Sequence, residues 1–139
     1  MSRAPELMAE LDRARVQEEI LSTTVMVTSA QACQLLGLPA SDPSATMRRK
    51  EHGQGILRLT VKGRAAYPLF QFDVEARVVF PALCDIMALK PSRWSDVRLL
   101  HWLSSPHLDF GGPPAHVLGT DGQAVVAAFA REIEIASHG

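Results

Sequence analysis

The most concentrated chemistry in this chain of 139 residues is a block of positive charge between residues 44 and 70. The block holds one carboxylate, Glu51, and its net charge is +5. Its six cations are Arg48, Arg49, Lys50, Arg58, Lys62 and Arg64. Residues 1–43 and 71–139 each carry a net charge of −3, so the whole chain is slightly acidic at −1. Cations gathered on one surface bind polyanions such as the phosphate backbone of DNA. The block therefore predicts a nucleic-acid surface, against the alternative of a merely solvated charged face.

Residue types that serve catalysis or metal binding do not form a recognisable motif. The five histidines show no HxH or HxxxH spacing and have no pair of cysteines beside them: His52, His101, His107, His116 and His138. Cys33 and Cys84 lie in apolar helical patterns, where the pKa of a thiol is expected to rise and its reactivity to fall. We expect no catalytic residue, no metal site and no cofactor, and hence not an enzyme.

Composition predicts a folded protein that is not embedded in a membrane. Hydrophobic residues make up 47% of the chain and charged residues 21%, which allows a core to form. No apolar run approaches the roughly 20 residues that a membrane span needs. The N-terminal segment is charged and lacks the apolar core of a signal peptide, and the two cysteines suggest no disulfide framework. We expect a cytoplasmic location.

The elements before the basic block predict an arm and a helix-turn-helix. Residues 5–21 predict a helix with an incomplete apolar stripe, either solvated or packed on a second copy, so we expect a homodimer. Thr28 and Ser29 are candidate caps of a short helix that closes at Gly37. Asp42 and Pro43 have the pattern of a cap followed by the first helical residue, and the second helix is expected to end at Gly53. Two short helices joined by a tight turn outline a helix-turn-helix.

Helical geometry assigns the faces of this second helix. At about 100° per residue, the helix turns four residues outward: Ser44, Ala45, Arg48 and Arg49. Met47 faces the core, and Lys50 lies on the same side of the helix as Met47. Small residues allow a helix to enter the major groove, and arginines reach guanine edges or phosphates. This is the composition of a recognition helix.

A basic hairpin is expected directly after this helix. Apolar residues alternate with polar or cationic ones from residue 57 to 62, a turn is expected at Gly63 and Arg64, and residues 65–70 can form the return strand. Pro68 should confine that strand to the edge of a sheet. The hairpin resembles the wing of a winged helix, with Arg58, Lys62 and Arg64 directed at flanking phosphates.

The second half of the sequence predicts helices at 75–89 and 95–103, a short helix that begins at Pro113 or Pro114, and a final helix. That last helix should start with a capping box at residues 120–123 and bury the stripe Val126, Phe129, Ala130 and Ile133. We expect Trp102 in the core, and Trp94 and Phe110 either in the core or at a partner. The fold class is therefore mainly α with a small β-hairpin. An N-terminal helical arm (1–24) precedes a winged helix-turn-helix half (25–73) and a helical half (74–139).

Residues 99–132, LLHWLSSPHLDFGGPPAHVLGTDGQAVVAAFARE, resemble the toxin-binding domain of the Xre/MbcA/ParS antitoxins. Upstream, VTSAQACQLLGL at 27–38, the basic helix, and YPLFQFD at 67–73 resemble the DNA-binding half of the same group, so the resemblance covers about residues 25–135. It differs at residues 109–111, where Asp-Phe-Gly stands in place of the family's usual Asp-Gly-Arg.

The resemblance implies an antitoxin that neutralises a cognate RES-domain toxin and binds double-stranded operator DNA to repress its own operon. It places the toxin contacts in the helical half, at these residues: Phe110, Gly112, Pro114, Leu118, Gly119 and Arg131. The alternative is a protein-interaction module or a transcriptional regulator of similar fold without a toxin partner.

Overall fold

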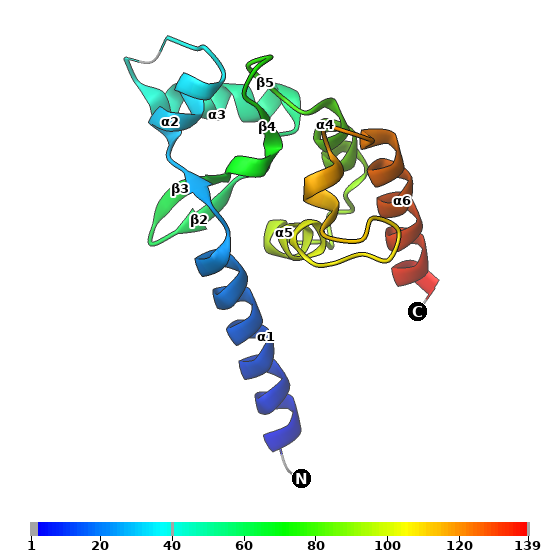
Figure 1. The fold of residues 1–139 in the computed structure, drawn as a ribbon. Helices are drawn as coiled ribbons and strands as arrows, with labels where there is room; N and C mark the ends of the chain where they lie inside the picture. The colour runs from blue at the N-terminus through cyan, green and yellow to red at the C-terminus, as the bar shows by residue number, and fades with distance from the viewer. Residues whose placement is uncertain (1–2, 40, 139) are drawn as a thin grey trace.

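The computed structural model describes residues 3–39 and 41–138, and its first half combines a long helical arm with two short helices and a small sheet (Figure 1). In chain order these elements are α1 (Ala4–Thr23), β1 (Met26–Val27), α2 (Ser29–Leu35), α3 (Pro43–Gln54), β2 (Leu59–Val61), β3 (Arg64–Pro68) and the 3-10 turn η1 (Leu69–Gln71). The second half contains β4 (Phe72–Asp73), β5 (Val78–Val79), α4 (Pro81–Leu89), α5 (Asp96–Ser104), η2 (Pro114–Val117) and α6 (Gly122–His138). The prediction of a mainly α fold with a small hairpin is confirmed.

Local capping accounts for the two helices of the helix-turn-helix. The Thr28 side chain accepts a hydrogen bond from the Gln31 backbone N–H and completes a capping box at the start of α2. Asp42 accepts from the Ala45 N–H at 3.2 Å at the start of α3. The expected end of α3 at Gly53 is wrong, because the helix continues to Gln54 and its left-handed cap is Gly55, at φ +59°. A Cβ at Gly55 would lie 3.2 Å from the backbone of Cys84 in α4, so glycine also permits the close approach of the two halves there.

The sheet is three-stranded and antiparallel in the order β1-β3-β2, which corrects the position expected for Pro68. Pro68 lies in the central strand, paired with Met26 of β1, and not at an edge. The ladder between β2 and β3 ends at Ala66, so the missing N–H of Pro68 leaves no described β2 partner unbonded. The hairpin turn also differs by one residue. Lys62 and Gly63 occupy it, at φ +53° and +76°, as a two-residue type I′ connection requires, and Arg64 opens β3.

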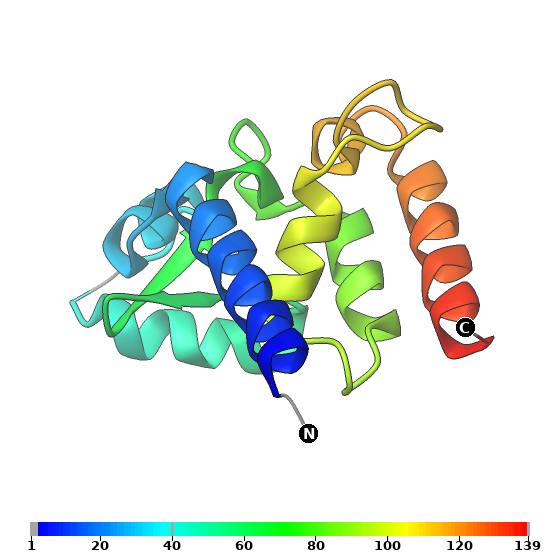
Figure 2. The ribbon, with the colours of Figure 1, turned by 90° about the horizontal axis from the view of Figure 1, so that it is seen from below.

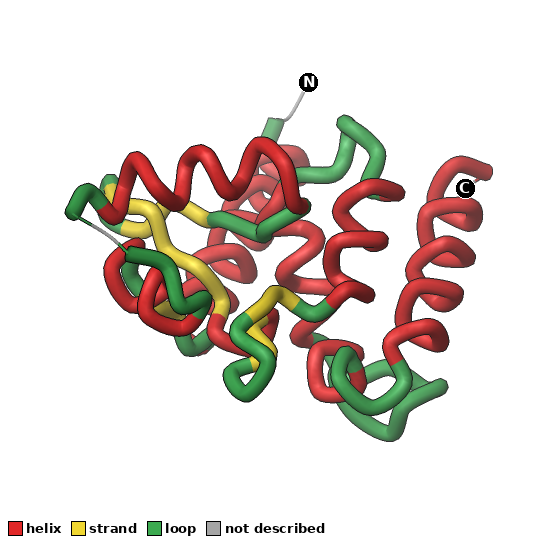
Figure 3. The backbone as a smooth tube through the Cα atoms, turned by 90° about the horizontal axis from the view of Figure 1, so that it is seen from above, coloured by secondary structure: helices red, strands yellow, loops and turns green. Residues whose placement is uncertain are grey.

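Residues 75–80 are not helical, contrary to the sequence-based prediction. They form the turn and second strand of the β4–β5 hairpin, with Arg77 at φ +59° (Figure 3). Helix α4 begins only at Pro81, because proline suits the first helical position and keeps the preceding residue, Phe80, extended.

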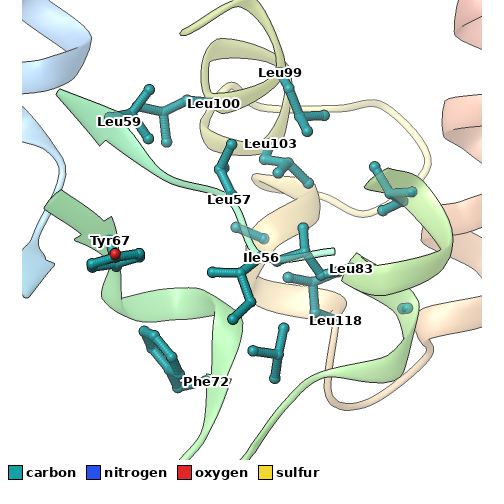
Figure 4. Close-up of a cluster of buried hydrophobic side chains, with 14 of the residues drawn as sticks. Ile56, Leu57, Leu59, Tyr67, Phe72, Leu83, Leu99, Leu100, Leu103 and Leu118 are labelled. Carbon is teal, nitrogen blue, oxygen red and sulfur yellow. The ribbon is translucent and has the colours of Figure 1, made fainter. Parts of the chain in front are cut away.

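One hydrophobic cluster contains side chains from both halves of the chain. Figure 4 shows Leu57 and Leu59, from the segment leading into the hairpin, beside Leu99, Leu100 and Leu103 of α5. All five side chains are nearly inaccessible to solvent. The helical half thus supports the base of the hairpin.

Trp94 lies in the core, one of the two places left open for it, whereas Trp102, expected in the core, does not lie fully inside it. Trp94 is buried against Phe129 of α6, with ring centroids 5.3 Å apart, and the Arg98 guanidinium lies 3.9 Å from its ring centroid. Trp102 is only partly buried, beside His107. The buried stripe of α6 is also rotated from the expected one: Phe129 is fully buried, with Val125 and Ala128, whereas Val126, Ala130 and Ile133 are partly exposed. Asp121 accepts a hydrogen bond from Ala124 N–H in the first turn of α6, in place of the expected cap at Thr120.

Helix α1 extends away from β1 as an arm with no buried residue (Figures 1 and 2). Its closest packing is against α5. Over residues 3–39 and 41–138, no helix combines the length and apolar character required to cross a bilayer.

Candidate nucleic-acid interface

An open groove of about 530 Å³ lies where the start of α2, one face of α3 and the β2–β3 hairpin meet. Its lining combines helix starts, cationic side chains and the base of the hairpin: Thr28, Ser29, Ala30, Pro43, Ser44, Arg48, Glu51, Arg58, Gly63, Arg64, Ala65 and Tyr67. These residues span a stretch from 28 to 67, so only the packing of the helix-turn-helix onto the hairpin brings them together.

Four of the eight residues predicted to contact DNA line this groove. Ser44 and Arg48 come from α3, Arg58 from the segment before β2, and Arg64 from the start of β3. The three arginines are exposed, while Met47 is fully buried and anchors α3, as its position on the helix predicted. The groove is therefore a surface on which three guanidinium groups converge.

The other four residues predicted to contact DNA lie outside the lining of the groove. Ala45 is half-buried on α3, and the Arg49 guanidinium is 3.4 Å from Thr46 Oγ1 on its own helix. Lys50 is half-buried on the side of α3 that faces α4, and Lys62 lies at the hairpin tip. Burial raises the pKa of the Cys84 thiol in α4, and nearby Lys50 acts in the opposite direction.

The three groove arginines differ in how far their charge is neutralised. Among the described residues, Arg48 and Arg64 form no ion pair. Arg58 Nε lies 3.8 Å from Glu51 Oε1, with 47% of the arginine side chain and 19% of the glutamate side chain exposed. The groove thus has two cations available for an incoming anion and a third that shares its charge with a carboxylate.

Sequence reasoning missed Glu51 and Tyr67 as members of the site. Glu51 lies one helical turn after Arg48, and this i,i+3 spacing is a signal that could have placed both on one face. The buried Tyr67 hydroxyl donates a hydrogen bond of 2.6 Å to Glu51 Oε1. Burial and this bond to the carboxylate raise the pKa of Tyr67 to about 12, so the phenol stays a neutral donor at physiological pH.

Two of the residues predicted to contact a toxin are buried and have packing roles instead. Pro114 and Leu118 lie in the interior of the helical half, where neither presents a surface to a partner. Gly119 is exposed at its own backbone, but a Cβ there would lie 2.9 Å from the Phe80 ring. Its small size is thus explained by packing.

The remaining three predicted toxin residues belong to one loop and the helix that holds it. Gly112 pairs with His107 across the loop, and Phe110 lies half-buried with its ring centroid 5.1 Å from that of His107. Arg131 Nη2 of α6 is 2.7 Å from Asp109 Oδ2 and ties the loop to the helix. Leu108, at the tip, is fully exposed. Within the described residues, no group of three or more potential ligands could hold a metal ion.

Comparison with known proteins identifies a shared fold but no family. No family model matches the chain, and no curated protein matches it. A solved structure entitled "NMR structure of Rv2175c" is similar, with a TM-score of 0.64 and 16% sequence identity. The alignment covers 79% of this chain and 82% of that one. At this level of identity the likeness establishes the fold alone.

Proposed function

We propose that this chain is a DNA-binding protein that lays α3 and the β2–β3 hairpin on double-stranded DNA. The observation that carries the proposal is the convergence of Arg48, Arg58 and Arg64 in one open groove between the second helix of a helix-turn-helix and a hairpin. In an otherwise acidic chain, this places the strongest local positive charge on the element that can enter a major groove.

The groove residues divide into two kinds of contact. Ser44 and Arg48 lie on α3, where a short hydroxyl and a long guanidinium reach base edges or the phosphates that flank them. Arg64 starts the hairpin strand that follows the tip at Lys62, and both suit contacts to the backbone of the duplex. Phosphate contacts supply affinity and salt dependence, and base contacts supply sequence preference. Repression of an operon by a dimer that binds a two-fold operator is the regulatory role that we propose for this arrangement.

The neighbours Arg48 and Arg49 provide a matched test, because only Arg48 lines the groove. Replacing Arg48 by alanine is expected to weaken binding to duplex DNA by about 1–3 kcal/mol if the guanidinium is bidentate to a base. The same change at Arg49 should cost less than about half of that, since its guanidinium lies against Thr46. Fluorescence anisotropy with a labelled duplex measures both affinities. Equal affinities of the Arg48 variant and the unmodified protein would remove α3 from the interface.

A second proposed role is capture of a RES-domain toxin by the helical half, as the resemblance implies. The observation that favours a protein partner is the loop that carries Phe110, whose tip, Leu108, is fully exposed although it is a large apolar side chain. Co-expression with a tagged RES-domain protein is expected to yield a complex that Leu108→Asp weakens. Failure of the unmodified chain to co-purify with the RES-domain proteins tested would leave DNA binding as the proposed function.

A further inference from the structure

We propose that Glu51 competes with DNA phosphate for Arg58 and thereby lowers the affinity of the groove for DNA of any sequence. The inference rests on the proposed function, because it assigns a role to Glu51, which among the described residues is the acidic side chain that lines the proposed DNA surface. Glu51 is then a residue that sets the strength of phosphate binding without touching a base.

The position of Glu51 is fixed by its neighbours. Its Oε1 accepts the hydrogen bond of 2.6 Å from Tyr67, a side chain that is 1% exposed and belongs to the central strand of the sheet. The carboxylate therefore cannot swing out of the groove without breaking a short bond to a buried donor. Because it is held at the base of the groove and is mostly covered, it is badly placed to read a base edge itself.

The contact between Glu51 and Arg58 is Coulombic. Arg58 Nε and Glu51 Oε1 are 3.8 Å apart, which satisfies an ion pair but is too long for a hydrogen bond. Nearly half of the Arg58 side chain is exposed toward solvent. A phosphate that approaches Arg58 therefore meets a guanidinium already facing one negative charge, and part of the attraction is lost.

This loss is a different share of the total binding free energy in the non-specific and the specific DNA complex. Non-specific binding depends almost wholly on phosphate contacts, each of which contributes about fivefold in affinity at about 0.15 M salt if log K changes by 0.9 per released ion. A specific complex would gain in addition from the base contacts proposed for Ser44 and Arg48 on α3, and Glu51 forms its ion pair with Arg58 and none with Arg48. A carboxylate beside Arg58 thus lowers the affinity of both complexes, and this loss is a larger share of the total binding free energy in the non-specific complex.

The test is the affinity of the full-length chain for a labelled duplex of random sequence. Glu51→Gln is expected to bind about fivefold more tightly at about 0.15 M salt, because one negative charge leaves the groove while the amide oxygen still accepts from Tyr67. The matched control is Glu134→Gln on α6, which makes the same change of net charge on an exposed residue outside the groove and should alter affinity less than about twofold. Glu51→Ala gives a second variant with the same expected gain.

A double-variant cycle tests whether Glu51 lowers DNA affinity by weakening the attraction between Arg58 and phosphate. In the Arg58→Gln background, the gain from Glu51→Gln should fall below about twofold. Unchanged or weaker binding by both Glu51 variants overturns the inference, and so does a gain of the same size without Arg58. Failure of the proposed function is a different result, in which the unmodified chain does not bind the duplex or removal of Arg48 leaves its binding unchanged.

Discussion

Replacing Gln71 by methionine is expected to lower the free energy of unfolding by about 3–5 kcal/mol, although the two side chains have similar volumes. Gln71 is fully buried, and its side-chain amide bonds to both backbone polar groups of Leu57, as a residue of a neighbouring strand would. Its Oε1 accepts from the Leu57 N–H at 2.9 Å, and its Nε2 donates to the Leu57 carbonyl at 2.9 Å and to the Pro68 carbonyl at 3.2 Å. Methionine supplies neither donor nor strong acceptor, so three buried backbone groups lose their partner at about 1–3 kcal/mol each before relaxation.

Urea unfolding followed by circular dichroism measures this loss. Gln123→Met, on the exposed side of α6, is the matched control and should change the free energy by less than about 0.5 kcal/mol. Since Leu57 directly precedes Arg58, the Gln71 variant should also bind DNA less well under conditions where it remains folded. A destabilisation below about 1 kcal/mol would mean that the amide does not stabilise the base of the hairpin.

Removing the three groove arginines together has the largest effect expected on binding. The triple variant Arg48→Gln, Arg58→Gln and Arg64→Gln is expected to bind duplex DNA on the order of 100-fold more weakly at about 0.15 M salt, since Arg58 and Arg64 each contribute about fivefold as phosphate contacts and Arg48 contributes at least about as much. Glutamine keeps a polar side chain in each place, and all three positions are exposed, so the fold should be unaffected.

A control with the same net charge separates the groove from the overall charge of the chain. Arg13, Arg15 and Arg77 are also exposed and do not line the groove. Changing these three to glutamine should weaken binding less than about tenfold, because charges farther from the duplex are screened by salt. Equal losses in the two triple variants would show that net charge alone controls the affinity.

Those parts of the fold that depend on neighbouring residues could be predicted from the sequence. The caps at Thr28, Asp42 and Ser95 each use a side-chain oxygen and a backbone N–H within three residues, so the pattern contains both partners. The position of Met47 on the inner face of α3 follows from helical period alone. Such signals gave the helix-turn-helix and the hairpin.

Features that depend on contacts between distant segments could not be predicted. The periodicity of the apolar pair Val78 and Val79 fits a helix or a strand, and the left-handed conformation of Arg77 that turns the chain has no sequence signal. Gln71 bonds to a residue 14 positions away, so only the tertiary fold shows that this glutamine stabilises the core. For the same reason the sequence could not distinguish the buried Trp94 from the partly exposed Trp102.

The sequence predicted the positive charge of the candidate site but not which residues line it. The count of cations identified the region, and alternation along the hairpin identified Arg58. Which cations converge depends on how α3 packs, and that packing turns Lys50 toward α4 and leaves Arg49 outside the groove. Tyr67 enters the site because β3 is the central strand, which the proline at position 68 argued against.

The salt dependence of DNA binding tests the central claim most directly, because it counts the phosphate contacts that the groove makes. The logarithm of the association constant for one duplex is measured against the logarithm of salt concentration for the unmodified chain and for the triple arginine variant. We expect a slope shallower by about 1.8 in the variant for Arg58 and Arg64, at about 0.9 for each lost phosphate contact, and by about 2.7 where Arg48 also lies on a phosphate. Parallel lines for the two proteins would contradict the proposed interface, because neither Arg58 nor Arg64 would then lie on a phosphate.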